Sequence, residues 1–392
     1  MRIVGVIAEY TPFHLGHAHH LQQARERYGA DAVVVVMSSV FTQRGDAAIL
    51  SPLSRARMAL SCGADAVFAL PAAWAVRDSE HFALGGVSLL KGLGCDAISF
   101  GTESANLQAL QTAASLLEHP NEAFRAAVQC RMSQGLPYPA ALSNAMGDLH
   151  PDCSKLLESP NSTLAVCYLR AMLRLNIHME VVPVPRIGSY HNTALTGVLP
   201  SATALRGAIL RGDWGSVRSA MPEEAYAILR EEAKLGRIHR PEALATALLY
   251  RLRTMTDADY SVLPDVSEGI EYRLQAAASA ECTRNDVLLA AKARRYPYAR
   301  LSRLATHALL GLTDKTLPDS TPDAAMLLGF RREARGLFTH FKERGTLPIW
   351  GKAADFDRQS AWFQTEMRAC DLWALGAGLP GGLAVPQGIA VE

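Results

Sequence analysis

Residues 3–17, with the sequence IVGVIAEYTPFHLGH, join an apolar run to a turn that contains two histidines. The run from Arg2 to Ala8 has no polar face, so it predicts a short strand that is buried on both sides. Thr11-Pro12 ends this strand, because proline has no N–H to donate and restrains the residue before it. Gly16 then begins a predicted helix that extends to about Tyr28.

The two histidines, His14 and His17, lie at the turn and at the start of this helix. A helix N-terminus favours an anion, and imidazole rings can donate to phosphate oxygens. A single histidine at a helix start is more often a surface or capping residue. The His-x-Gly-His spacing favours phosphate binding instead, because Gly16 allows close approach of the backbone. A protein metal site is the weaker alternative, since Glu9 is the only nearby carboxylate at ligand spacing.

The composition is that of an ordinary globular protein. The 392 residues are 49% hydrophobic and 20% charged, and the formal net charge of +1 gives no general attraction to nucleic acid or membrane. No uninterrupted apolar run reaches the roughly 18 residues of a membrane span, and no signal peptide is evident. The seven cysteines are scattered, with no Cys-x-x-Cys, which favours free thiols and a cytoplasmic location.

Apolar runs alternate with helical patterns through the first half of the chain. Further strands are predicted at 33–37, 66–70, 97–100 and 178–184, and this alternation is typical of a parallel doubly wound sheet. The predicted fold class is therefore α/β, with a Rossmann-like nucleotide-binding domain over residues 1–200. A mainly α-helical domain is predicted over residues 201–392, with helical segments at 222–236, 241–256, 267–281, 284–294, 298–310 and 355–375. The residues from Gly376 onward are expected to form a loose tail.

The carboxyl ends of the predicted strands carry the polar residues of interest. Ligands of such sheets bind at this edge, so Arg44 and Asp46, in the loop 38–46, are predicted to contact substrate rather than solvent alone. Gly101 could let a purine base or ribose approach the backbone. Asn161 could cap its helix or contact a ligand. Arg186 could bind a phosphate or ribose, or lie on the surface.

A second phosphate clamp is predicted where residues 200–206 begin another helix. Ser201, Thr203 and Arg206 offer two hydroxyls and a guanidinium at that helix start, opposite the histidines. The alternative is an ordinary capped helix N-terminus.

A basic and aromatic patch late in the chain suggests contact with RNA. Interleaved tyrosines could stack on bases, and the only acidic residue nearby is Asp286. The alternative is a solvated helix face, which we favour for a second basic run over residues 234–253. The predicted RNA-binding residues are Lys292, Arg294, Arg295, Tyr298, Arg300 and Arg303.

With these residues in place, the sequence resembles the bacterial tRNA(Met) cytidine acetate ligase family, within the HIGH-type nucleotidylyltransferase superfamily. The resemblance extends in order over nearly the whole chain. The matching stretches are 5–20 (GVIAEYTPFHLGHAHH), 37–48 (MSSVFTQRGDAA), 100–103 (FGTE), 159–161 (SPN), 185–188 (PRIG), 201–206 (SATALR), 268–274 (EGIEYRL) and 295–304 (RYPYARLSRL).

The resemblance implies an ATP-dependent ligase that activates acetate as acetyl-adenylate and releases pyrophosphate. The acetyl group then passes to N4 of the wobble cytidine of elongator tRNA(Met), giving N4-acetylcytidine. His14 and His17 would be catalytic, and Mg²⁺ would be bound largely through the triphosphate. The implied ATP-binding residues, together with the helix-start clamp, are Ile7, Ala8, Glu9, Tyr10, Thr11, Pro12, Phe13, His14, Leu15, Gly16, His17, Ala18, His19, His20, Gly101, Asn161, Arg186, Ile187, Ser201, Thr203 and Arg206.

The sequence departs from the family pattern at a few positions. Thr11 and Leu15 stand where asparagine is expected, and Ser39-Val40 stands where Gly-Asn is usual. These departures spare both histidines and Gly16.

Two other functions are compatible with the residues. One is a nucleotidylyltransferase that joins a nucleotide to a small phosphorylated substrate and therefore keeps the nucleotide in its product. The other is a non-catalytic RNA-binding protein that retains the fold. Exchange of pyrophosphate into ATP with acetate would distinguish the ligase from the non-catalytic protein.

Overall fold

The computed structural model describes residues 1–104, 106–185, 202–267, 269–318, 320–382 and 389–391. Its centre is an eight-stranded sheet with the order β5-β4-β1-β2-β3-β6-β7, and β8 pairs with β6. The first five strands are parallel to one another, and each matches a predicted strand to within two residues. The predicted α/β class and parallel sheet are therefore confirmed. These strands are β1 (Ile3–Ala8), β2 (Ala32–Ser38), β3 (Ala66–Leu70), β4 (Ala97–Thr102) and β5 (Glu180–Pro185).

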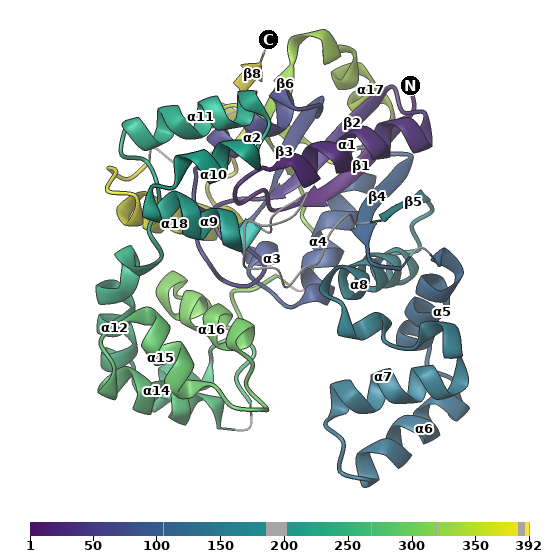
Figure 1. Cartoon of the computed structure of the whole chain (residues 1–392), viewed down its shortest axis with the longest axis vertical. Helices are drawn as coiled ribbons and strands as arrows, with labels where there is room; N and C mark the ends of the chain where they lie inside the picture. Colours follow the sequence, from purple (N-terminus) through teal and green to yellow (C-terminus); the bar gives the residue numbers. More distant parts are fainter. Residues whose placement is uncertain (105, 186–201, 268, 319, 383–388, 392) are drawn as a thin grey trace.

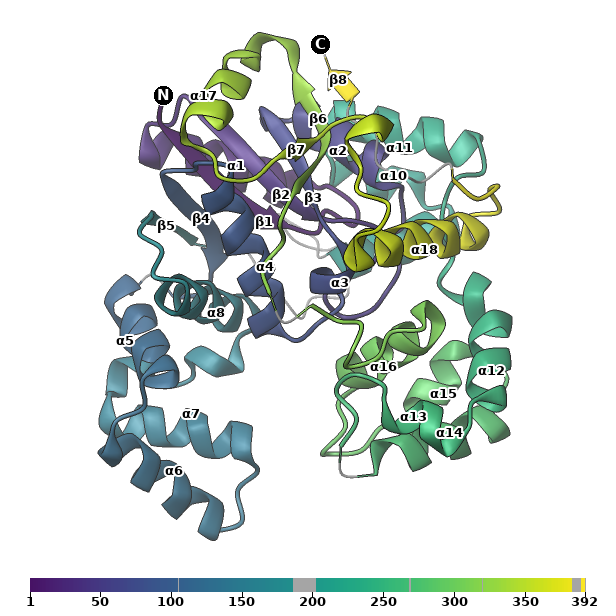
Figure 2. The same ribbon diagram turned by 180° about the vertical axis from the view of Figure 1, so that it is seen from behind.

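Helices cover both faces of the sheet, as Figures 1 and 2 show from opposite sides. One face carries α1 (Leu15–Tyr28) and α2 (Pro52–Ser61), and the other carries α4 (Ser79–Gly92) and α8 (Pro160–Arg174). The chain proceeds from β1 to β3 on one side and then continues from β4 to β5 on the other side of β1. The strand order thus reverses between β1 and β4, which is where open α/β sheets bind ligands.

The C-terminal half of the chain also contributes to this sheet, which the sequence did not predict. β6 (Ala325–Arg331) is antiparallel to β3, and β7 (Ile349–Trp350) and β8 (Ile389–Val391) pair with β6. The sheet therefore crosses the predicted boundary at residue 200, and the expected loose tail includes a strand. The final helix, α18 (Ala361–Gly376), begins six residues later than predicted, because residues 353–355 form a 3-10 turn and residues 356–360 are not helical.

Two helical lobes extend from the same end of the sheet layer (Figure 1). The first lobe comprises α5 (Leu107–Glu118), α6 (Glu122–Ser133) and α7 (Tyr138–Leu149). The second lobe, residues 245–310, has a hydrophobic core of its own that includes Leu252, Leu274 and Leu304. Its helices are α12 (Ala245–Thr254), α13 (Asp257–Ser261), α14 (Ile270–Ala280), α15 (Arg284–Ala291) and α16 (Tyr298–Leu310).

The remaining helices pack around the sheet. In the second half of the chain, α11 contacts α2 and α18 contacts α3, so helices from both halves enclose the strands. None of the helices in the described ranges is long and apolar enough to cross a membrane. The bounds are α3 (Ala72–Ala75), α9 (Ala202–Arg211), α10 (Trp214–Ser219), α11 (Glu223–Lys234) and α17 (Gly336–Arg344).

Arg55, in α2, joins the carboxyl ends of two central strands. Its side chain is fully buried and donates to the carbonyl oxygens of Glu9 (2.7 Å) and Ser38 (3.0 Å), and to those of Leu50 and Ser39. Burial lowers its pKa to about 9, because desolvation disfavours the charged form. The carbonyl dipoles compensate for that desolvation, so this one side chain fixes where both strands end.

Glu366, in α18, is the buried carboxylate that faces this cation. It accepts hydrogen bonds from the Ala72 N–H (2.6 Å) and from the Ser39 hydroxyl, and its charge interacts with Arg55. Burial raises its pKa, while these hydrogen bonds and Arg55 oppose the rise. Ser39, one of the departures from the family pattern, is therefore a buried structural residue.

We expect Arg55→Met to lower the free energy of unfolding by about 3–5 kcal/mol, because it leaves buried carbonyl groups and Glu366 without their cation. Arg57→Met, on the same helix, is the matched control. Arg57 makes an exposed pair with Glu231 at 3.3 Å, so its loss should cost at most about 1 kcal/mol. Urea denaturation measures both values, and equal losses would contradict the role given to Arg55.

Stability should also fall in mild acid through His239, which precedes the second lobe. The residue is 3% exposed, and burial, followed by the charge of Arg284, lowers its pKa from 6.5 to about 4. Between pH 6.5 and about pH 4, the His239 side chain binds a proton in the unfolded chain but not in the folded one. The free energy of unfolding therefore decreases as the pH falls. The expected loss from pH 7 to pH 5 through this residue is about 2 kcal/mol.

His239→Phe provides the measurement, because phenylalanine has a similar size and does not titrate. Denaturation curves at pH 7 and pH 5 should show a smaller acid-induced loss for the variant than for the wild type. Identical losses would mean that His239 does not contribute.

Candidate functional site

A cavity of about 520 Å³ lies at the carboxyl ends of β1, β4 and β5, where the strand order reverses. The loop after β1, the start of α1, the loop 42–47 and the starts of α8 and α9 enclose it. Most of the residues that the sequence predicts for ATP or substrate line it. These are Ile7, Ala8, Glu9, Tyr10, Thr11, His14, Gly16, His17, His19, His20, Arg44, Asp46, Gly101, Asn161, Thr203 and Arg206.

The two motif histidines are held by the backbone at the start of α1. His14 is the N-cap residue, and its Nδ1 accepts the N–H of Gly16 at 3.1 Å. His17 Nδ1 accepts the N–H of His14 at 3.2 Å, and the two rings stack with centroids 3.7 Å apart. Because each Nδ1 is an acceptor, the neutral ring carries its proton on Nε2. Because capping uses Nδ1, each ring can donate a hydrogen bond through its Nε2–H, and both rings line the cavity.

Buried aromatic side chains support these rings from behind. The ring centroids of Tyr10 and Phe13 lie 4.7 and 5.5 Å from that of His17. Both aromatic residues are almost fully buried, and Tyr10 has a positive φ of 47°. Phe13 packs in the core and does not line the cavity. Phe13 therefore contributes by orienting the ring of His17.

Two arginines from different elements bring positive charge to the cavity. Arg206, in α9, donates to the carbonyl oxygen of Thr11 at 2.9 Å and to the Thr203 hydroxyl at 3.1 Å. Arg44 is exposed on the loop that follows β2. Both lie close enough to Glu9 to lower its pKa. The cavity therefore combines two guanidinium groups, the histidine donors and a helix N-terminus, which is the donor set that polyphosphates prefer.

Glu9 is the carboxylate at the centre of this basic surface. Its Oε1 accepts the N–H of Gln43 at 2.6 Å, which joins the end of β1 to the loop 42–47. Burial raises its pKa, and the Gln43 N–H together with Arg206 and Arg44 partly opposes the rise. Tyr168, in α8, lines the same cavity and is also buried.

Asn161 is fixed by a neighbouring carboxylate instead of capping its own helix. It donates to Glu103 Oε1 at 2.5 Å, and Glu103 Oε2 accepts the N–H (2.9 Å) and hydroxyl (3.0 Å) of Ser162. Burial acts to raise the pKa of Glu103, but these hydrogen bonds bring it below its usual value. The Glu103 carboxylate thus already occupies the N-terminus of α8. The N-terminus of α1 is therefore the better place for a phosphate group.

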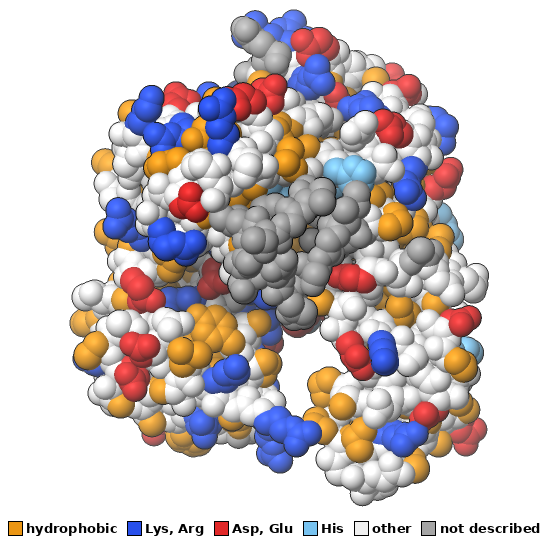
Figure 3. Space-filling model, viewed as in Figure 1, with side chains coloured by type: hydrophobic (Ala, Val, Ile, Leu, Met, Phe, Trp, Pro, Cys, Tyr) orange, Lys and Arg blue, Asp and Glu red, His pale blue; other side chains and the backbone are white. Residues whose placement is uncertain are grey.

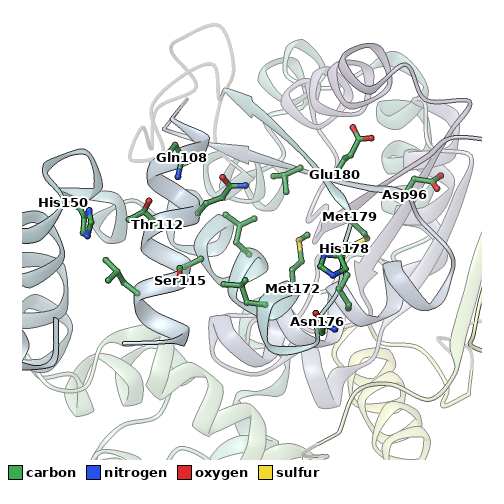
Figure 4. Close-up of a pocket in the computed structure, with 17 residues that line it drawn as sticks. Asp96, Gln108, Thr112, Ser115, His150, Met172, Asn176, His178, Met179 and Glu180 are labelled. Atoms are coloured by element: carbon green, nitrogen blue, oxygen red, sulfur yellow. The ribbon is translucent and has the colours of Figure 1, made fainter. Parts of the chain in front are cut away.

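A second cavity, of about 940 Å³, lies at the opposite ends of β4 and β5 (Figure 4). Asp96 and Glu180 line it, with His150, His178 and apolar side chains of α8, and none of the described residues that line it is a lysine or arginine. The larger cavity therefore lacks the cations that a triphosphate needs, and the smaller one is the candidate site.

Some predicted ligand residues do not line the cavity. Phe13 and Pro12 are buried beneath it, the Leu15 N–H donates to the Ala220 carbonyl, and Ala18 packs against the core. These four residues are part of the motif in the sequence, but in the structure they support the cavity wall instead of lining it. Arg186, Ile187 and Ser201 lie outside the described residues.

The predicted RNA patch divides into exposed and structural residues. Lys292, Arg294 and Arg295 are exposed on the turn between α15 and α16. Arg300 instead donates to the Asp265 carbonyl (2.7 Å), and Arg303 pairs with the Asp265 carboxylate with only 11% of its side chain exposed. Figure 3 shows lysine and arginine side chains at the tip of the second lobe, beside the gap between the lobes.

Tyr298 is half-buried, and its hydroxyl donates to Asn285 at 3.4 Å. Tyr298 is therefore less exposed than Lys292, Arg294 and Arg295.

Sequence reasoning missed the cavity residues that come from apolar helix faces. Tyr168 and Phe82 occupy positions that the helical pattern assigns to the core, and both are buried. No local signal separates them from ordinary core residues. Gln43 was within the loop that the sequence singled out, but its backbone bond to Glu9 is not visible from its residue type.

Comparison with known proteins shows which family the chain belongs to. The HIGH Nucleotidyl Transferase family model matches residues 1–378. A tRNA(Met) cytidine acetate ligase of Geobacillus sp. is 34% identical over 95% of this chain and 94% of its own length. The chain belongs to the tRNA(Met) cytidine acetate ligase family. Another member, from Acetivibrio thermocellus, is 32% identical over 96% of this chain and 95% of its own length.

Solved structures of the ligase family share the whole fold. Thermotoga maritima TmcAL in its apo form superimposes with a TM-score of 0.92 and 26% identity, over all of both chains. The same protein bound with alpha-thio ATP gives a TM-score of 0.90, also over the full length of both chains. As a member of the ligase family, the present protein is thus an enzyme, and its fold is that of an ATP-binding relative.

We expect His14→Ala and His14→Asn to weaken ATP binding by about 10- to 100-fold, because each loses an imidazole donor to a charged oxygen. They should differ in stability. Alanine removes the cap of α1 and costs about 1 kcal/mol, whereas asparagine is a good N-cap residue. Calorimetric titration and thermal melting separate the two effects, and wild-type affinity in both variants would contradict this placement of the nucleotide.

Proposed function

We propose that this protein activates acetate with ATP as acetyl-adenylate and transfers the acetyl group to N4 of the wobble cytidine of elongator tRNA(Met). The proposal rests on one observation. His14 and His17 cap α1 inside a basic cavity, at the point where the strand order of the sheet reverses. Its relatives are named as ligases of tRNA(Met), cytidine and acetate, and the Thermotoga maritima relative is solved with bound alpha-thio ATP.

In the first step an acetate oxygen attacks the α-phosphorus, and the bond between that phosphorus and the bridging oxygen to the β-phosphate breaks. Pyrophosphate leaves with the electron pair of that bond. Negative charge grows on the phosphate oxygens, where the Nε2–H groups of His14 and His17 and the N-terminus of α1 stabilise it. No protein nucleophile is needed, so the contribution of the chain is positioning and charge stabilisation.

We propose that Mg²⁺ enters with ATP and is held largely by triphosphate oxygens, where it would neutralise part of their charge. In the described part of the chain no group of three histidine, cysteine or acidic side chains is placed to hold a metal ion. The cationic side chains around the cavity, Arg44 and Arg206, would contact the triphosphate oxygens and not the ion, which the nucleotide itself would hold.

In the second step the cytidine N4 attacks the acetyl carbon, and the bond from that carbon to the phosphate oxygen breaks. AMP leaves with the electron pair, and N4 loses a proton. Exposed Lys292, Arg294 and Arg295 in the second lobe suit contact with tRNA phosphates, and their lobe packs directly on the loop that lines the cavity.

We expect wild-type protein, ATP, acetate and unmodified tRNA(Met) to yield N4-acetylcytidine, detected by nucleoside mass spectrometry. ATP and acetate alone should support exchange of labelled pyrophosphate into ATP. His14→Ala should reduce both reactions by at least about 100-fold, because the donor acts in the first step.

His119→Ala is the matched control, since His119 is exposed in the first lobe and lines neither cavity. It should behave as wild type. A product that retains the nucleotide would support transfer to a small phosphorylated substrate instead. Binding of tRNA without any exchange would favour the non-catalytic alternative.

A further inference from the structure

Residues 41–47 form a short hairpin after β2, which we name the 41–47 hairpin. Phe41 and Ala47 pair as an antiparallel bridge, and the Thr42 N–H donates to the Asp46 carbonyl at 2.8 Å. Gly45 makes the turn with a φ of 82°, in the region that favours glycine. Phe41 is buried in an apolar cluster with Leu310 of the second lobe, so the hairpin is anchored at its base.

The inner side of the hairpin forms one wall of the candidate site. Gln43 donates its N–H to Glu9, and its side-chain amide donates to the Arg77 carbonyl at 2.9 Å. Arg44 and Asp46 both line the cavity. The position of this hairpin therefore sets where Glu9 and Arg44 stand relative to the nucleotide.

The outer side of the hairpin is bound by the second lobe, chiefly through Arg284. Its guanidinium donates to the Asp46 carboxylate (3.1 Å), the Gly45 carbonyl (3.4 Å) and the Ser302 hydroxyl (2.6 Å). The Thr306 hydroxyl also donates to the Gly45 carbonyl at 2.6 Å.

The backbones approach so closely here that no side chain fits between them. A Cβ on Gly45 would lie 2.7 Å from the Ser302 carbonyl oxygen and 2.8 Å from the Arg303 backbone. The hairpin and the start of α16 are therefore in direct contact, with no side chain between them at this point.

Arg284 also occupies a particular place in its lobe. It is the first residue of α15, and its own N–H donates to Glu242 at 2.9 Å. The turn that carries Lys292, Arg294 and Arg295 connects the other end of α15 to α16, and α16 provides Ser302. Only 10% of the Arg284 side chain is exposed, so it is a poor candidate for contact with RNA.

We propose that Arg284 is a positioning residue for acetyl transfer, which ties the lobe that carries the basic turn to the 41–47 hairpin of the cavity. The proposal rests on the function proposed above. A buried, charge-assisted contact that reaches three acceptors holds a defined geometry, and displacement by about 1 Å near a reacting centre can cost about 100-fold in rate.

The test is steady-state kinetics of tRNA(Met) acetylation with Arg284→Gln. We expect kcat to fall at least about tenfold, while the KM for tRNA stays within about twofold. Arg284→Lys should recover part of the loss, because an ammonium group can still reach Asp46. Ser302→Ala, which removes one of the three acceptors, should give a smaller decrease and serves if Arg284→Gln does not fold.

Arg253→Gln is the matched control. Arg253 also binds carbonyl groups of its own lobe, those of Ala278 (2.7 Å) and Glu281 (2.9 Å), but does not contact the hairpin. It should keep the wild-type kcat, and its melting temperature should show how much stability such a clamp contributes.

Three results would overturn the proposal. They are a wild-type kcat in Arg284→Gln, a raised KM for tRNA with unchanged kcat, or an equal loss of kcat in Arg253→Gln. If the wild-type protein itself forms no acetylcytidine, the proposed function fails instead, and the two failures are thereby distinguished.

Discussion

The site depends on one buried cation. Arg55 binds the carbonyl oxygens at the ends of β1 and β2, and the histidine turn and the 41–47 hairpin both leave from those ends. Glu366 faces the same point from the last helix and holds Ser39 and the Ala72 N–H. A charge in the interior is stable only when its surroundings replace water, and here strand-end carbonyls and an opposing carboxylate do so.

The histidine pair links local folding to chemistry. The lone pairs on Nδ1 are used to cap α1, so the protons that remain are on the nitrogens suited to a phosphate. A doubly protonated ring would lose its acceptor and with it the cap. The stability of the first helix turn and the supply of donors to the cavity therefore rest on the same two rings.

Local signals in the sequence were enough to predict the first five strands and α1, because apolar runs and turn residues act over a few positions. Arg55 could not be predicted in this way. It lies two residues from Arg57 in the same helix, and only the tertiary structure buries one side chain completely and leaves the other partly exposed. The placement of Asp46 against Arg284 likewise depends on a contact between residues 238 positions apart.

The pairing of β3 with β6 bears on how the chain is synthesised. β3 is buried and apolar throughout, yet until β6 leaves the ribosome one of its edges has no partner. Unpaired apolar edges invite association with other nascent chains. β8 follows β6 by more than 50 residues and pairs with it, so distant downstream residues complete this side of the sheet, and β3 stays unprotected until β6 has been synthesised.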